Sequence, residues 1–118
     1  MIRLVHCIRS QPQLTVTDFR QHFQGDAFRT LLKALADLTG AVDFHASLTL
    51  NIELNAELQA DRAGEPPFDA VIEIRWSSGQ ELMQRIERED AQALIAEMDE
   101  VQAQFIDFSR SARFFTED

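Results

Sequence analysis

The chain has 118 residues, with 11 Lys or Arg against 20 Asp or Glu, so its formal net charge at pH 7 is −9. This length predicts a single domain over residues 1–118 that is large enough to bury its own hydrophobic core. The negative charge argues against nucleic acid and against anionic membrane surfaces as partners, because binding to either needs a basic face. No stretch of apolar residues approaches the length that spans a membrane.

The cysteine and histidine residues indicate the cellular compartment and bear on metal binding. Cys7 is the only cysteine, so no disulfide can form within the chain, and a lone thiol is typical of a reducing compartment. The first ten residues carry no apolar run of signal-peptide length, and we expect the protein to be cytoplasmic. No pair among His6, His22 and His45 has the spacing of metal ligands, so we expect no metal site.

The first part of the chain predicts a strand followed by a helical region. Residues 2–9 alternate between apolar and other side chains, as a strand does. Thr15 with Asp18 forms the pattern of a capping box and predicts a helix start. The apolar spacing is interrupted at Gly25 and ends at Gly40, which predicts either two helices or one bent helix.

The middle of the chain predicts two strands joined by a long loop. Apolar and polar residues alternate strictly from Val42 to Leu54, which predicts one long strand with an apolar and a polar face. Residues 55–67 contain Gly64 and Pro66-Pro67 among polar residues and are expected to form the loop. Residues 69–76 alternate again and predict the third strand.

The remaining residues complete the pattern of a known architecture. Ser78 with Glu81 predicts a second capped helix, and residues 94–105 carry an apolar stripe at helical spacing after a charged break. Residues 108–116 predict a last strand. The order strand, helix, strand, strand, helix, strand predicts an α+β, ferredoxin-like βαββαβ fold, with a four-stranded antiparallel sheet covered by helices on one face.

In this plan the polar faces of the second and third strands lie away from the helices. A register in which paired residue numbers sum to 122 would set Glu73 beside Thr49 and Arg75 beside Ser47. The polar face is either bare to solvent or stacked on a second copy, in which case the two sheets enclose a cavity. The predicted residues of this face are Asp43, His45, Ser47, Thr49, Asn51, Glu53, Val71, Glu73 and Arg75, with Val5 and Cys7 from the first strand.

Three residues on this face are candidates for chemistry. A histidine such as His45 would suit proton transfer, because histidine is the side chain that ordinarily changes charge near neutral pH, although a solvated or interface histidine is the simpler interpretation. Burial would raise the pKa of Glu73 toward the range useful for acid–base work, and a salt bridge to Arg75 is the alternative. The guanidinium of Arg75 could hold an anionic oxygen of a substrate or could neutralise the carboxylates around it.

Other residues are expected to line the same cavity or to pack in the core. Ser47, Thr49, Val71 and Cys7 are predicted to contact a ligand there. Arg9 is close to Cys7 in the sequence, but nothing else suggests a nucleophile, and a small packed side chain is the simpler interpretation of Cys7. His6 lies between Leu4 and Ile8 on the apolar side of the first strand, and we expect a core histidine with satisfied hydrogen bonds.

Several segments, spread over most of the chain, match the pattern of a known family. They are Met1-Ile2-Arg3-Leu4-Val5, Leu14-Thr15 with Asp18-Phe19-Arg20 and Phe23, Phe68-Asp69-Ala70-Val71-Ile72-Glu73-Ile74, and the tail with Phe105-Ile106-Asp107, Ser109-Arg110-Ser111 and Phe114-Phe115-Thr116-Glu117. In their order and spacing they resemble the EthD-like proteins, named for ethyl tert-butyl ether degradation, of the dimeric α/β-barrel superfamily. The closing segment carries the most specific part of this resemblance.

The resemblance implies a homodimer in which two sheets face each other and form a dimeric α/β barrel, without a metal or an organic cofactor. It implies a cofactor-independent small-molecule enzyme of catabolic or secondary metabolism, of the isomerase, dehydratase or cyclase, or monooxygenase type. Such an enzyme would act by proton transfer on a hydrophobic compound between the facing sheets. Glu73 and His45 would be its acid–base groups, and Arg75 would hold an anionic oxygen.

The sequence departs from the family pattern at two places. Many members carry a His after the first helix, where this chain has Gln24-Gly25-Asp26-Ala27, and many carry an aromatic residue at the position of Arg75. The missing His after the first helix favours the alternative of a non-catalytic dimeric protein that binds a ligand or assists another protein. A purely structural dimer is the third possibility.

Overall fold

A computed structural model describes residues 1–118 and shows one four-stranded antiparallel sheet, with the strand order β2-β3-β1-β4. This α+β ferredoxin-like architecture confirms the predicted βαββαβ plan, with one extra helix. The elements are β1 (Ile2–Ile8), α1 (Val16–Gln24), α2 (Asp26–Leu38), β2 (Asp43–Leu48), α3 (Glu53–Asp61), β3 (Ala70–Trp76), α4 (Gly79–Ile86), α5 (Glu89–Gln102), the 3-10 turn η1 (Phe108–Arg110) and β4 (Ala112–Glu117).

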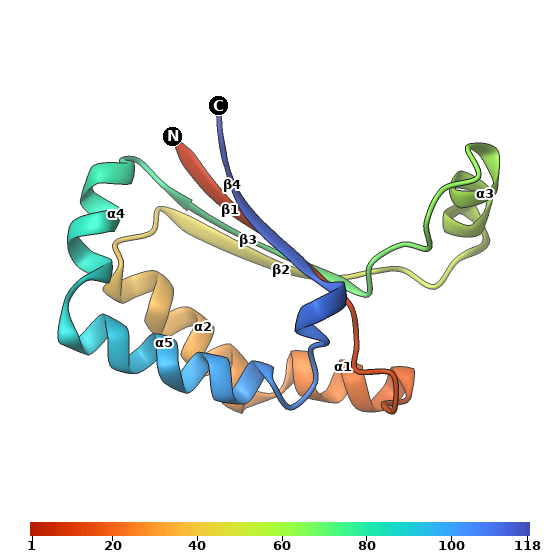
Figure 1. The fold of residues 1–118 in the computed structure, drawn as a ribbon, viewed down its shortest axis with the longest axis horizontal. Helices are drawn as coiled ribbons and strands as arrows, with labels where there is room; N and C mark the ends of the chain where they lie inside the picture. The colour runs from red at the N-terminus through yellow and green to blue at the C-terminus, as the bar shows by residue number, and fades with distance from the viewer.

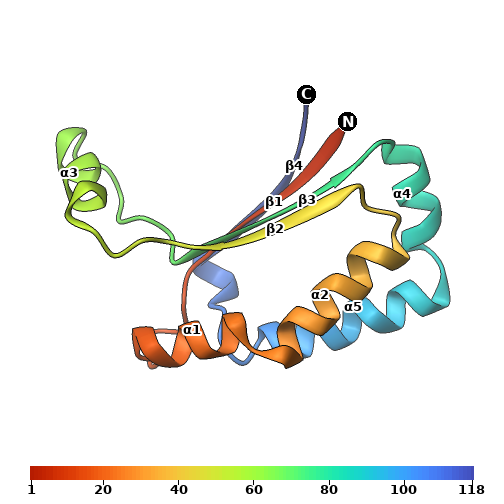
Figure 2. The ribbon, with the colours of Figure 1, turned by 180° about the vertical axis from the view of Figure 1, so that it is seen from behind.

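The helices α1, α2 and α5 cover one face of the sheet, and no helix covers the other (Figure 1; Figure 2). We call the uncovered side the open face. Alternate residues of β3 point toward the helices, so Ile72, Ile74 and Trp76 join the buried core. An aromatic cluster that includes Phe23 and Phe105 fills the space between α1, α2 and the end of α5.

Local signals place the helix ends where the sequence predicts them. The backbone N–H of Asp18 donates to Thr15 Oγ1 over 3.0 Å, and the N–H of Glu81 donates to the Ser78 hydroxyl over 3.3 Å. Gly25 separates α1 from α2, so the first helical region is two helices. Gly40 follows α2 with φ of +76°, a conformation that glycine adopts without steric cost.

The predicted second strand is too long. Pairing stops at Leu48 opposite Ala70, because β3 offers no residues beyond that point, and Glu53 begins α3 instead of extending the strand. The expected loop over residues 55–67 therefore contains most of a helix. Residues 108–110 likewise form η1 before β4, so the last strand starts later than predicted.

The predicted register between β2 and β3 is also wrong. His45 pairs with Glu73 and Asp43 pairs with Arg75, so Thr49 and Ser47 are not their neighbours. The error is four residues, which is two full side-chain alternations. Because the shift is even, the faces on which these side chains lie are nevertheless those predicted.

Candidate functional site

The open face is a regular array of side chains from all four strands. It brings together most of the predicted site residues, but Asn51 and Glu53 lie outside the sheet and Thr49 lies just past the end of β2, where its hydroxyl donates to the carbonyl of Phe68. The three cross-strand rows, from β2 to β4, are Asp43–Arg75–Arg3–Thr116, His45–Glu73–Val5–Phe114 and Ser47–Val71–Cys7–Ala112.

Charges on the open face are partly paired. Arg75 donates through Nε to Asp43 Oδ1 over 2.7 Å and through a second nitrogen to Oδ2. This pairing holds the pKa of Asp43 below its usual range and raises the pKa of Arg75. Glu73 and His45 are cross-strand neighbours, and neither makes a hydrogen bond or ion pair within the chain. A chemical role for Glu73 and His45 thus stays a prediction.

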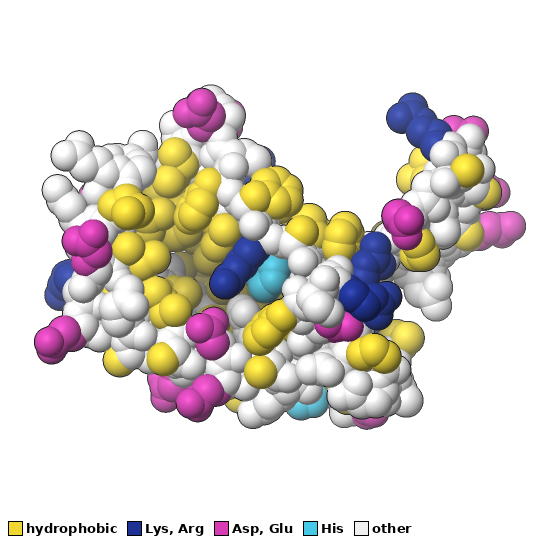
Figure 3. Space-filling model, viewed as in Figure 1, with side chains coloured by type: hydrophobic (Ala, Val, Ile, Leu, Met, Phe, Trp, Pro, Cys, Tyr) yellow, Lys and Arg dark blue, Asp and Glu magenta, His cyan; other side chains and the backbone are white.

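A mainly hydrophobic pocket lies on the other side of the sheet. Figure 3 shows a hollow lined by hydrophobic side chains between the sheet and the helices, with basic and histidine side chains at its edge. Its volume is about 340 Å³, and most of the residues that line it are hydrophobic. The sheet contributes Leu4, Ile72 and Ile74, and the helices contribute Leu32, Leu35 and Met98.

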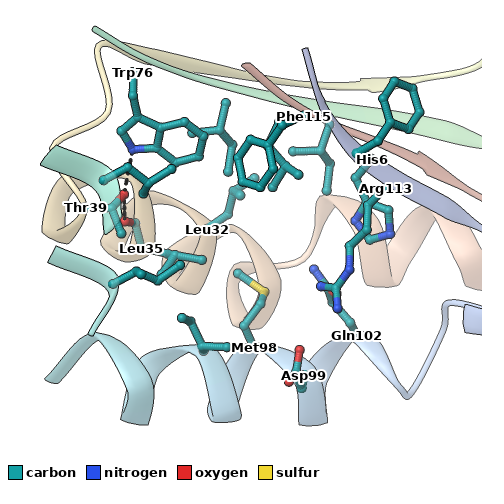
Figure 4. A pocket seen from close by; sticks show the side chains of 17 residues that line it. His6, Leu32, Leu35, Thr39, Trp76, Met98, Asp99, Gln102, Arg113 and Phe115 are labelled. Carbon is teal, nitrogen blue, oxygen red and sulfur yellow. Dashed lines mark hydrogen bonds between the residues drawn. The ribbon is translucent and has the colours of Figure 1, made fainter. Parts of the chain in front are cut away.

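One end of the pocket is closed by a satisfied polar pair (Figure 4). The indole Nε1 of Trp76 donates to Thr39 Oγ1 over 3.1 Å, and that hydroxyl donates to the carbonyl of Leu35 over 2.7 Å. Because these polar atoms bond to each other, they leave no free donor facing the pocket. This end is suited to an apolar part of a ligand.

The other end of the pocket is polar. His6, Gln102, Arg113 and Asp99 gather there in Figure 4, and the same four residues line a second hollow of about 360 Å³ that opens toward Ser111. Burial, helped by the positive charge of Arg113, lowers the pKa of His6 to about 4. The imidazole is therefore neutral at pH 7. The side chains of Gln102 and Arg113 have no hydrogen-bonding partner in the chain, so their donors are free for a ligand.

His6 is buried as predicted, with 7% of its surface exposed, but its ring makes no hydrogen bond to the protein. The expectation of a satisfied core histidine is wrong in that respect. The other polar residues of this end were not predicted as site residues. The sequence carries a signal for one of them, since Gln102 interrupts the apolar side of α5, whereas Arg113 comes to lie opposite His6 only when β4 pairs with β1.

No group of three or more His, Cys, Asp or Glu side chains is arranged to hold a metal ion. None of the helices combines the length and the apolar character needed to pass through a bilayer. What the fold offers is an apolar pocket with one polar end.

Three solved structures share this architecture. One, from Bacillus halodurans, is described as an ethyl tert-butyl ether degradation (EthD) family protein; it matches 100% of this chain and 98% of its own, with a TM-score of 0.63 and 14% identity. The chain shares the fold of an EthD family protein. The EthD resemblance of the sequence is thereby confirmed at the level of fold.

The other two are described as dimeric proteins of unknown function with a ferredoxin-like fold. The one from Bacteroides fragilis covers 99% of this chain and 95% of its own at a TM-score of 0.62 and 11% identity. The one from Thermobifida fusca covers 99% and 90% at a TM-score of 0.59 and 13% identity. No family model matches the chain, and no curated protein sequence does.

Proposed function

We propose that this chain is a cofactor-independent enzyme that moves a proton on a small hydrophobic carbonyl compound, and that the pocket between the sheet and the helices holds the substrate. The observation that supports this most directly is a neutral, unpaired imidazole, His6, at the polar end of an otherwise apolar pocket of about 340 Å³. A pocket of this kind would bind the apolar body of a ligand and present its polar group to His6.

Three side chains at the polar end would carry out this reaction. His6 would take a proton from the carbon beside the carbonyl, and the enolate oxygen would be stabilised by the guanidinium of Arg113 and the amide of Gln102. Return of the proton to a different carbon completes an isomerisation. The protons and electrons balance without any further reactant.

Deuterium exchange tests this proposal. With 2-tetralone as the probe in D₂O, the protein should speed exchange at the carbon beside the carbonyl above the rate in buffer, and His6→Gln should reduce that increase about 100-fold. His45→Gln is the matched control on the open face and should exchange like the wild type. If His45→Gln or Glu73→Gln abolishes exchange while His6→Gln does not, the reaction belongs to the open face instead.

A non-catalytic ligand-binding protein is the second candidate, because His6 has no carboxylate partner to orient its ring. Titration with 2-naphthol, followed by the indole N–H resonance of Trp76, measures binding separately from exchange. Saturable binding without exchange of 2-tetralone would favour this candidate. If neither probe binds, both candidate functions are refuted for this pocket.

We also propose that two copies of the chain stack their open faces as a homodimer. Val5 on the inner strand β1 and Phe114 beside it on the edge strand β4 place apolar surface on that face, and the ion pair of Arg75 with Asp43 limits the cost of covering those two charges. The two similar structures described as dimeric support this assembly. Sedimentation at micromolar concentration should show a dimer, and a clean 13.5 kDa monomer would refute it.

A further inference from the structure

The segment between β2 and β3 leaves the body of the protein. Residues 49–68, which we call the arm, carry α3 away from the sheet, and both views show α3 on the side opposite the helix layer (Figure 1; Figure 2). No residue of α3 is buried. The arm exposes four large apolar side chains by 46–65% of their surface: Leu50, Ile52, Leu54 and Leu58.

The base of the arm is fixed to the sheet. Arg9 donates to the carbonyls of Pro66 and Pro67 over 3.0 and 3.2 Å, and its guanidinium lies 4.2 Å from the centre of the Phe68 ring. On the other side, the N–H of Thr49 donates to the carbonyl of Asp69 over 3.0 Å. These contacts set the direction in which the arm leaves the body.

The tip of the arm lacks the contacts that keep a short helix folded. Helices shorter than about 12 residues are marginal in water, and α3 spans nine residues. Its N-cap is Ile52, which provides no side-chain hydrogen bond. Leu54 and Leu58 are four residues apart and share one side of the helix, so a partner on that side would stabilise it.

The chain exposes more surface than a typical folded monomer of its mass. The chain exposes 7573 Å². A folded monomer of its mass, 13.5 kDa, exposes roughly 6,500 Å². The excess of roughly 1,000 Å² is close to the area of about 800 Å² that each partner buries in a stable protein–protein interface.

We propose that the arm packs its apolar side chains against a second copy of this chain. The arm projects toward the side of the sheet on which the open face lies, so a copy stacked there would extend the same interface onto α3. A second copy also accounts for the excess area, since the arm and the open face would be covered together. This inference rests on the homodimer proposed above and is independent of the chemistry proposed for the pocket.

The test compares two double variants of exposed apolar residues. Leu54→Gln with Leu58→Gln keeps helix propensity but removes the apolar contact, and we expect its dimer dissociation constant to rise at least 100-fold, because a symmetric dimer loses four leucines. Val16→Gln with Met83→Gln is the matched control, since these residues are 68% and 59% exposed on α1 and α4. Sedimentation equilibrium gives both constants, and circular dichroism checks that each variant is folded.

Equal dissociation constants for the two double variants would overturn the arm contact and leave the open-face dimer standing. A monomeric wild type would overturn the arm contact and the open-face dimer together. The deuterium-exchange experiment would still test the proton transfer proposed for the pocket. Hydrogen exchange of the wild type is a second measurement that needs no variant. The amides of α3 should be protected above the dissociation constant and exchange freely below it, and exchange that does not depend on concentration would also overturn the proposal.

Discussion

Phe105→Ala should lower the free energy of unfolding by about 3–5 kcal/mol, a large share of the stability of a domain of this size. Phe105 is fully buried where the end of α5 meets α1 and α2. Its ring centre lies 5.7 Å from that of Phe19 and 5.3 Å from that of Phe28, and it stacks on the imidazole of His22 at 5.4 Å. Truncation removes contacts on three sides, and the backbone of the three helices limits how far the hole can close.

Chemical denaturation at one fixed protomer concentration measures this loss, since a dimer makes stability depend on concentration. Phe108→Ala is the matched control. Phe108 is 53% exposed in η1, so its loss should cost less than about 1 kcal/mol. Equal losses for the two variants would show that the aromatic cluster does not hold the helix layer together.

The second large expected effect is that of His6 on the pH dependence of the free energy of unfolding. Burial in the folded chain lowers the pKa of His6 to about 4, whereas the ordinary pKa of histidine, 6.5, applies to the unfolded chain. Between these values the unfolded state binds more protons, so the free energy of unfolding should fall as the pH drops from 6.5 to 4. The shift is equivalent to about 3 kcal/mol, fully lost below pH 4.

Denaturation of wild type and His6→Gln across pH 4–7 measures this contribution. The carboxylates titrate in both proteins, so the difference between the two curves isolates His6. In His6→Gln the free energy of unfolding should lack the part of the decline below pH 6.5 that His6 causes in the wild type. The control His45→Gln should keep that decline, because the side chain of His45 is exposed. Parallel curves for wild type and His6→Gln would mean that His6 is not held neutral by the pocket.

Local sequence signals predict the fold better than the site. The N-caps Thr15 and Ser78 and the alternation in β3 act through neighbouring residues, and all three are found as predicted, although Asp18 and Glu81 do not return the second hydrogen bond of a capping box. The alternation from Val42 to Leu54 predicts too long a strand, because a pattern of period two shows which side chains are apolar but not whether a partner strand exists. No partner strand pairs with the residues beyond Leu48, and the apolar residues of the arm are exposed.

The site depends on contacts between distant residues, which a single sequence does not specify. His6, Gln102 and Arg113 come together only when β4 pairs with β1 and α5 crosses beneath them. Face assignment by parity correctly grouped His45 and Glu73 on one side of the sheet. The same pattern did not predict a site on the helix-facing side of the sheet, because an apolar strand face predicts a filled core rather than a pocket.

The edge strand β4 links the two halves of the molecule. Phe114 lies in the open-face row with Val5, while Arg113, Phe114 and Phe115 all border the pocket, and all six residues of the strand are exposed in the single chain. A ligand in the proposed pocket and a second copy on the proposed dimer face would therefore contact the same strand. If the binding of one changes the affinity for the other, the reverse effect must be of the same factor, because coupling between two binding events is reciprocal.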